Sequence, residues 1–256
     1  MSSAPVPPHP PSLAYDVLNS PTMPSDEAAK TLCVIHGLLG VGRNLHTLTR
    51  TLLKEAEAPG AAWKALLLDL RNHGRSSRVP LPPPHDLSAA AADVVAVLRS
   101  LGAGAGSAEA QIPTAATAPH AIIGHSLGGK VALELLAQLA RHAEEGGAAS
   151  VVRIPRHVWV LDSWPGLVNR GHGASQDILK VVETLRSIPQ PLRSREQLYE
   201  LLSARGMSLA MQHWLGSSLG QDGPGAFRFL FNLDGAEDLF MSYCDSGTSG
   251  DEGSLG

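Results

Sequence analysis

The stretch from Ala121 to Glu134 constrains the fold of this chain more than any other. It passes from a short apolar run to a run of good helix formers, and the sequence Gly-His-Ser-Leu-Gly (124–128) lies between them. A G-x-S-x-G pattern between a strand and a helix predicts a sharp turn with Ser126 at its apex. Glycines at 124 and 128 avoid collisions in such a bend. The turn would present the Ser126 hydroxyl at the positive end of a helix, where an oxyanion is stabilised. The alternative is an ordinary strand-to-helix turn.

A second apolar run, at residues 31–35, is predicted to be a strand that ends in His36-Gly37-Leu38-Leu39-Gly40. In acyl-transfer enzymes of this plan, the backbone N–H after such a His-Gly pair donates to the oxyanion. We assign this donor to Leu38, and the second donor to the N–H of Leu127. A plain strand-to-loop turn is the alternative, and we expect His36 to brace the loop rather than act as a base.

Strand and helix patterns alternate along the chain. Buried strands are predicted at residues 65–68, 120–124 and 157–161, an early edge strand within 13–18, and helices at 44–57, 87–101 and 127–141. Asn44 is a candidate cap for the first helix. This alternation predicts an α/β fold, a mostly parallel sheet with helices on both faces. The reactive groups of such a sheet gather beyond the carboxyl ends of its strands.

Residues 174–220 interrupt the alternation with three helical patterns, at about 175–187, 194–205 and 207–219. We expect them to form a helical cap that provides an apolar acyl pocket. The candidate lining residues are Trp164, Leu167, Met207, Met211 and Trp214. Ordinary core packing is an equal alternative for each of them. Residues 227–233 are predicted to be extended, and 234–240 to begin a helix with Asp234 as its cap.

The globular domain is predicted to span residues 13–240, between a Pro- and Ser-rich lead (1–12) and a polar tail (241–256) that are both expected to be disordered. A chain of 256 residues that is 43% hydrophobic suffices for one large domain. Its net charge of −4 gives no electrostatic case for nucleic acid or an anionic membrane. Cys33 is expected in a buried strand and Cys244 in the tail, without a disulfide or metal spacing.

We expect no metal and no cofactor, a small acyl or ester substrate, and a monomer. No apolar run is long enough to span a bilayer. The first twelve residues contain no Lys or Arg and match neither a secretory signal nor a typical transit peptide. The expectation is a soluble intracellular protein, with the cytoplasm and an organelle (mitochondrion or plastid) both open.

Five stretches, in this order along the chain, resemble the α/β-hydrolase superfamily. They are IHGLLG (35–40), LDLRNHG (68–74), IGHSLGGK (123–130), VLDS (160–163) and FNLDG (231–235). Their details resemble the short-acyl esterase branch, which includes the alpha/beta hydrolase domain-containing protein 11 group and bacterial esterases. The resemblance implies a serine hydrolase of carboxylic esters or related acyl compounds, with Ser126 as the nucleophile. The acid is Asp162 or Asp234; we prefer Asp162, because it ends a strand.

The chain departs from this family near its C-terminus. The family's catalytic histidine lies in a Gly-His loop after the last strand, whereas no histidine follows His213 here. We therefore expect a C-terminally truncated fold that lacks the last two strands, about sixty residues at usual element lengths, and strongly impaired catalysis. We expect His125 to point away from the pocket and His213 to pack within the cap. A non-catalytic acyl-ligand-binding protein and a partial gene product with an exposed sheet edge remain as alternatives.

Overall fold

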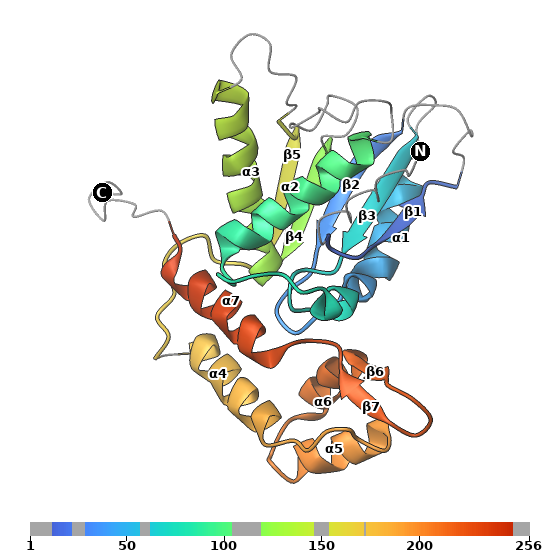
Figure 1. The fold of residues 1–256 in the computed structure, drawn as a ribbon, viewed down its shortest axis with the longest axis vertical. Helices are drawn as coiled ribbons and strands as arrows, with labels where there is room; N and C mark the ends of the chain where they lie inside the picture. The colour runs from blue at the N-terminus through green and yellow to red at the C-terminus, as the bar shows by residue number, and fades with distance from the viewer. Residues whose placement is uncertain are drawn as a thin grey trace, which may run out of the picture.

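The computed structural model describes residues 12–21, 29–56, 62–103, 119–145, 154–171 and 173–247. A five-stranded sheet with the order β1-β3-β2-β4-β5 organises them (Figure 1). Its strands are β1 (Tyr15–Asn19), β2 (Lys30–Ile35), β3 (Trp63–Leu68), β4 (Ala121–His125) and β5 (His157–Leu161). β1 runs antiparallel to β3, and the other neighbours are parallel. The predicted α/β architecture with a mostly parallel sheet is confirmed.

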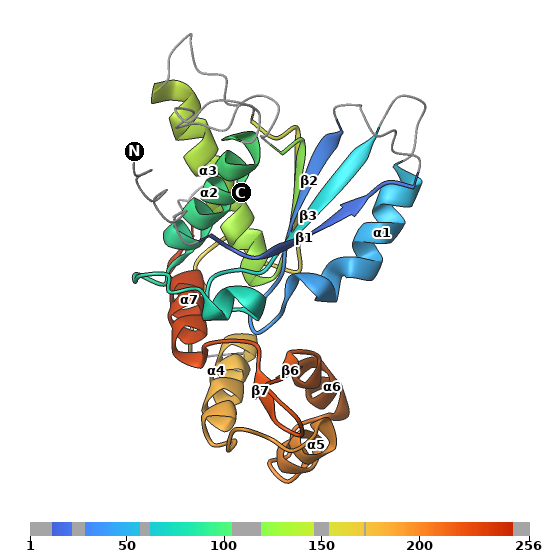
Figure 2. The same cartoon turned by 45° about the vertical axis from the view of Figure 1, so that its right-hand side comes forward.

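Helices cover both faces of the sheet, with α1 (His46–Glu55) on one side and α2 (Leu87–Ala103) and α3 (Leu127–Glu145) on the other (Figure 2). This arrangement follows from the central strands, which are apolar on both sides and must be covered twice. Alternate residues of β2 enter different cores: Leu32 packs in the cluster that includes Leu53 of α1, and Cys33 in the larger cluster with residues of α2 and α3. Cys33 is fully buried, as predicted.

A helical lobe lies beyond the carboxyl ends of the strands (Figures 1 and 2). It consists of α4 (Gly173–Arg186), α5 (Arg195–Ser203), α6 (Leu209–Ser217) and the antiparallel pair β6 (Leu219–Gln221) and β7 (Phe227–Phe229). The three helical patterns and the extended return are therefore confirmed. Serines cap two of the helices, because Ser194 accepts a hydrogen bond from the backbone of Gln197 and Ser208 one from Met211.

The last helix, α7 (Leu233–Asp245), connects this lobe to the sheet domain. Two predictions for it were wrong. The cap is Asn232, whose side chain accepts hydrogen bonds from the amides of Asp234 and Gly235, and Asp234 lies inside the first turn. The helix also continues past Met241 and buries Cys244, where a disordered tail was predicted.

The predicted cap of α1 was also wrong. Asn44 belongs to a 3-10 turn that precedes α1 and therefore does not cap that helix.

β5 is an edge strand, and the prediction that it is buried was wrong. It pairs only with β4, and its residues are alternately exposed and half-buried. Trp159 is 48% exposed and Leu161 is 37% exposed. A continuous apolar run indicates a strand covered on both faces, but here the α1 side of β5 has no covering helix among the described residues.

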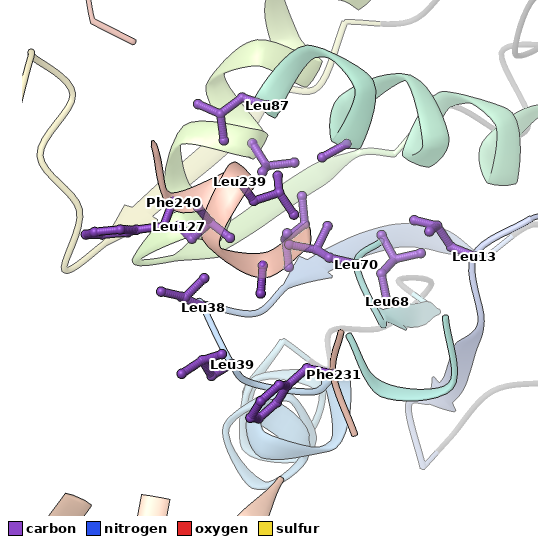
Figure 3. Close-up of a cluster of buried hydrophobic side chains, with 14 of the residues drawn as sticks. Leu13, Leu38, Leu39, Leu68, Leu70, Leu87, Leu127, Phe231, Leu239 and Phe240 are labelled. Atoms are coloured by element: carbon purple, nitrogen blue, oxygen red, sulfur yellow. The ribbon is translucent and has the colours of Figure 1, made fainter. Parts of the chain in front are cut away.

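The packing between α7 and the sheet domain places residues of both beside the elbow. Figure 3 shows Leu239 and Phe240 of α7 close to Leu127, the first residue of α3, with Leu38 on the neighbouring loop.

Within the described residues, no helix is both long and apolar enough to cross a membrane. The predicted lead, most of the two low-complexity insertions and the last nine residues lie outside the described ranges.

Candidate active site

Ser126 occupies the predicted bend between β4 and α3. Its backbone φ is +53°, in the left-handed region that non-glycine residues rarely adopt. The glycines around it are required by crowding: a Cβ on Gly124 would lie 2.1 Å from the carbonyl oxygen of Gly128, and a Cβ on Gly128 would lie 2.5 Å from that of Ile35. The Ser126 amide donates to the carbonyl of Leu161 at 2.8 Å. The bend is therefore a strained turn that the surrounding backbone enforces, and it presents the Ser126 side chain to the adjoining cavity.

The loop after β2 lies against this serine. A Cβ on Gly37 would come within 3.1 Å of the Ser126 Cβ, so only a glycine allows this approach without a shift. The next amide, that of Leu38, has no hydrogen-bond acceptor among the described residues. Leu127 is the first residue of α3, and an amide at that position has no acceptor within its own helix. Both amides remain our predicted oxyanion donors.

Two buried histidines hold the loop that carries Leu38. The Nε2 of His36 accepts the amide of Leu70 at 3.0 Å, and the Nε2 of His73 accepts the amide of Leu39 at 3.0 Å. Leu39 itself has a φ of +55°. These bonds tie the loops after β2 and β3 together. His36 thus braces the loop, as expected from the sequence.

The same contacts determine the charge of both rings. Because each Nε2 accepts a hydrogen bond, each Nδ1 carries the proton, and it donates to the carbonyl of Gly37 in His36 and of Arg71 in His73. Burial lowers the pKa of His36. Burial, followed by the nearby His36 ring, lowers the pKa of His73 to about 3. Both rings are therefore neutral near pH 7, and neither is available as a base for Ser126.

The two candidate acids lie in different places. Asp162 follows β5, has a φ of +50°, and lines the same cavity as Ser126. Asp234 is 77% exposed and forms an ion pair with Arg186 of α4 at 2.5 Å, and it is absent from the lining of that cavity. The structure thus brings Asp162 and Ser126 together and places Asp234 elsewhere.

A cavity of about 760 Å³ opens beside Ser126. Trp164 and Leu167, two of the predicted pocket residues, line it. The other three do not; they pack instead against the hydrophobic core, and they are Met207, Met211 and Trp214. The remaining lining comes from the loop after β5, from the start of α4 and from α7: Ser163, Val168, Asn169, Ala174, Ser175, Ile178, Phe240 and Tyr243.

None of the histidines that the structure describes lines this cavity. His125 belongs to the elbow, and its Nδ1 lies 3.1 Å from the position that a Cβ on Gly37 would occupy, the same position that the Ser126 Cβ approaches. His213 is exposed on α6 and lies against the Tyr199 ring, with centroids 5.6 Å apart. His125 is absent from the cavity lining, as expected. The expectation that His213 packs within the cap was wrong, because α6 exposes its side chain to solvent. His9 and His172 lie outside the described residues.

The family model described as "Alpha/beta hydrolase family" matches residues 33–245, which include the sheet, the elbow and the helical lobe. The chain belongs to the alpha/beta hydrolase family. The strained serine between β4 and α3 is the feature of this family that the sequence motif predicted.

Two curated alpha/beta hydrolases resemble the chain at low identity. The mouse protein "sn-1-specific diacylglycerol lipase ABHD11" is 26% identical over 224 residues, which cover 87% of this chain and 60% of the mouse protein. The protein of the same name from Xenopus laevis is 32% identical over 130 residues, 49% of this chain and 32% of that protein. The chain thus spans less than two thirds of the length of either relative.

Solved structures agree on the fold. A marine microorganism esterase has a TM-score of 0.68 and 21% identity, over 94% of this chain and 76% of that one. The peroxisomal alpha-beta-hydrolase Lpx1 from Saccharomyces cerevisiae has a TM-score of 0.55 and 18% identity, over 94% of this chain and 65% of that one. At this identity the likeness shows a shared alpha/beta hydrolase fold.

Sequence reasoning missed the contribution of α7 to the site. Phe240 and Tyr243 line the cavity, yet Tyr243 was assigned to a disordered tail. The signal was present as helical spacing, because apolar residues at 236, 239, 240, 243 and 244 lie on one helix face. The sequence places Lys130 only within the motif IGHSLGGK and does not predict its burial, whereas the structure buries its side chain. Among the described residues, no cluster of His, Cys, Asp and Glu could hold a metal ion.

Proposed function

We propose that this chain carries a serine acyl-hydrolase site that acts on carboxylic esters or related acyl compounds. The observation that carries the proposal is the strained Ser126, which opens onto a cavity of about 760 Å³ lined by Trp164 and Leu167. A cavity of this size is typical of small-molecule sites, and apolar walls suit the acyl group of an ester. The Ser126 oxygen would form a bond to the acyl carbon and expel the alcohol.

The neighbouring groups fit defined roles in this reaction. The amides of Leu38 and Leu127 would stabilise the negative charge that develops on the acyl oxygen. Asp162 is the preferred acid, because it lines the cavity with Ser126, whereas Asp234 is engaged with Arg186. An acid in this position orients a basic ring and stabilises its charged form.

We further propose that turnover in this chain is strongly impaired. A serine hydroxyl is a weak nucleophile near pH 7 unless a base accepts its proton. None of the described histidines lines the cavity, and His36 and His73 act as neutral braces of the neighbouring loops. Loss of the histidine from a working triad lowers turnover by about a million-fold, and oxyanion stabilisation alone leaves about a thousand-fold over water.

A burst assay with p-nitrophenyl butyrate tests both parts of the proposal. We expect slow release of p-nitrophenol that Ser126→Ala abolishes. Rapid turnover lost in Ser126→Ala would contradict the impairment and leave the site intact. Release that is unchanged in Ser126→Ala would contradict the assignment of the nucleophile.

Two further variant sets assign the acid and any base. Asp162→Asn should lower the Ser126-dependent rate, whereas Asp234→Asn should leave it near the starting value. A panel that replaces each of the 11 histidines by alanine shows whether any of them supports the residual rate. If Asp234→Asn alone is inactive while folded, the assignment of Asp162 is wrong.

A non-catalytic acyl-binding protein is the second candidate function. It is favoured because none of the described histidines lines this cavity, whose walls include Trp164 and Leu167. Dodecanoate would then raise the melting temperature of the wild type and of Ser126→Ala equally, and no p-nitrophenyl ester would be hydrolysed in a Ser126-dependent manner. Ser126-dependent hydrolysis of any ester in the series would exclude this candidate.

A further inference from the structure

Lys130 is a buried cation one turn beyond the nucleophile. Its Nζ donates to three backbone carbonyls, those of Gly166 at 2.8 Å and of Tyr243 and Ser246 at 2.5 Å. The same ammonium lies 4.3 Å from the centroid of the Tyr243 ring. All three donors of the ammonium are thus satisfied by two separate segments, the loop after β5 and the end of α7. A buried ammonium is tolerated only with such partners.

These two segments have further contacts with each other around Lys130. The amide of Val168 donates to the carbonyl of Cys244 at 3.0 Å, and Arg170 forms an ion pair with Asp245. Gly247 lies so close to the loop that a Cβ there would come within 2.4 Å of the Leu167 amide nitrogen. We call this set of contacts, centred on Lys130, the lysine clamp. The clamp joins the cavity wall of the β5 loop to the cavity wall of α7.

The lysine clamp lies between two cavities. The serine cavity of about 760 Å³ is lined by Trp164, Leu167 and Tyr243. A second cavity of about 550 Å³ is lined by Lys130 and by the immediate neighbours of those residues, Pro165 and Ser242, together with Ser246 and Gly247. Consecutive residues of both segments thus face opposite cavities. The joined segments thus form a partition between the two cavities, and Lys130 lies on the side of the second one.

We propose that Lys130 is a positioning residue that keeps this partition closed and thereby limits the length of the acyl group that the serine cavity accepts. The proposal deepens the proposed function and rests on it. Loss of the ammonium would leave three carbonyls without their donor, including two at the carboxyl end of α7, where a cation is favourable. The β5 loop would then separate from α7, and the serine cavity would extend into the second one.

The two cysteines provide a readout of the partition that needs no catalysis. Cys244 lies at the clamp with 1% exposure, and Cys33 lies in the central strand β2 with 0% exposure. Burial raises the pKa of both thiols, that of Cys33 to about 12. Both should therefore react slowly with Ellman's reagent, a disulfide that exchanges with the thiolate. Local opening of the clamp exposes Cys244 alone, whereas global unfolding exposes both.

The principal variant is Lys130→Met, which keeps the aliphatic stem and removes the donors. We expect Cys244 to react about tenfold faster or more, the change expected when hydrogen bonds to a charged group are lost, while Cys33 keeps its wild-type rate. Gly247→Ala is an independent variant that wedges the same contact apart with Lys130 in place, and it should act in the same direction. Lys54→Met, on the exposed surface of α1, is the matched control and should change neither rate.

Acyl length is measured by calorimetry with two non-reactive probes, butanoate and dodecanoate. Each methylene that leaves water tightens binding by roughly fourfold. Lys130→Met should therefore raise the preference for dodecanoate over butanoate by about tenfold or more, the gain from two buried methylenes. A residue that only stabilises the fold would weaken both probes in proportion and leave this ratio unchanged.

The possible failures are distinguishable. If Cys244 reacts no faster in Lys130→Met than in the wild type, the clamp does not hold the partition and the proposal is wrong. If Cys244 reacts faster but the dodecanoate-to-butanoate ratio stays at its wild-type value, Lys130 does not set acyl length and the proposal is also wrong. If neither probe binds the wild-type protein while Cys244 still responds, the acyl site of the proposed function is wrong, and the role in acyl length falls with it.

Discussion

At the scale of single residues, backbone strain gathers on one edge of the sheet. The non-glycine residues with positive φ in the described part of the chain are Leu39, Asn72, Ser126 and Asp162. Each follows one of the four parallel strands, at its carboxyl end. Such conformations persist only where surrounding contacts enforce them, and they concentrate at functional sites. The sequence motifs located these four turns, but only coordinates show that all four are strained.

The elbow glycines should be intolerant of any side chain. Gly124→Ala would place a Cβ 2.1 Å from a backbone oxygen, so we expect the free energy of unfolding to fall by about 1–3 kcal/mol, as for other overpacked sites. Gly171→Ala is the matched control, because its Cβ would meet only the Asn169 side chain at an ordinary 3.4 Å. Urea unfolding measures both. Equal stability of the two variants would show that the bend is looser than described.

The neutral histidine pair should make the protein sensitive to acid. The pKa of His73 is about 3 in the folded state against an ordinary value of 6.5. Between these values the unfolded chain takes up a proton that the folded chain does not, so the free energy of unfolding falls as the pH falls. The stabilising contribution is complete above pH 6.5. Each such residue adds a slope of up to about 1.4 kcal/mol per pH unit.

Urea unfolding of the wild type and of His73→Gln at several pH values from 7 to 5 checks this prediction. The variant should be less stable at pH 7, because a flexible glutamine does not fill the buried site of the ring or hold both of its hydrogen bonds in place, yet lose less stability per pH unit. His213→Gln, on the exposed surface of α6, is the control and should keep the wild-type slope. Parallel curves for the wild type and His73→Gln would mean that His73 titrates normally.

At the scale of elements, the sequence located nearly every helix and strand but misjudged their environment twice. β5 reads as a buried strand because His-Val-Trp-Val-Leu lacks polar alternation, and burial depends on neighbours that no local pattern reveals. The predicted end of α7, at residue 240, falls short of the observed end at Asp245, because Ser242, Asp245 and Ser246 resemble a polar tail. In the fold, the ammonium of Lys130 satisfies carbonyls of that segment from another helix. A tertiary contact of this kind leaves no signal in local composition.

The true cap of α7 gives a test of its boundary. The Asn232 side chain accepts the amides of Asp234 and Gly235, so Asn232→Ala should lower the free energy of unfolding by about 1 kcal/mol. Asp234→Ala should cost less, because its partner Arg186 is a surface residue and exposed ion pairs contribute little. Thermal or urea unfolding ranks the two. A larger loss in Asp234→Ala would return the capping role to that residue.

At the scale of the whole molecule, the two edges of the sheet differ. The β1 edge carries the charged Asp16, whose partner is Arg75. The β5 edge has no charged side chain within the strand, and Trp159 and Leu161 are exposed on it. Charges on an edge strand oppose pairing with another chain, and their absence favours it. We therefore expect any self-association of the chain to occur at the β5 edge.

Trp159→Lys should reduce concentration-dependent association of the protein. Val17→Lys on the β1 edge is a matched control, because Val17 and Trp159 are both 48% exposed. Light scattering over a concentration series would show a larger decrease in apparent mass for Trp159→Lys than for Val17→Lys. A wild type that is monomeric at all concentrations, or equal effects of the two variants, would show that the chain does not associate through the β5 edge.

The hydrogen bond from the Ser126 amide to Leu161 connects this serine to β5, an edge strand of the sheet. The left-handed backbone of the serine is thus anchored to a segment with a neighbour on one side only. Fraying of that segment would let the serine relax into an ordinary conformation and withdraw its hydroxyl. The rate at which a serine-directed reagent labels Ser126 would then depend on how well ordered β5 is. Labelling at position 126 would thus measure the stability of this edge of the sheet.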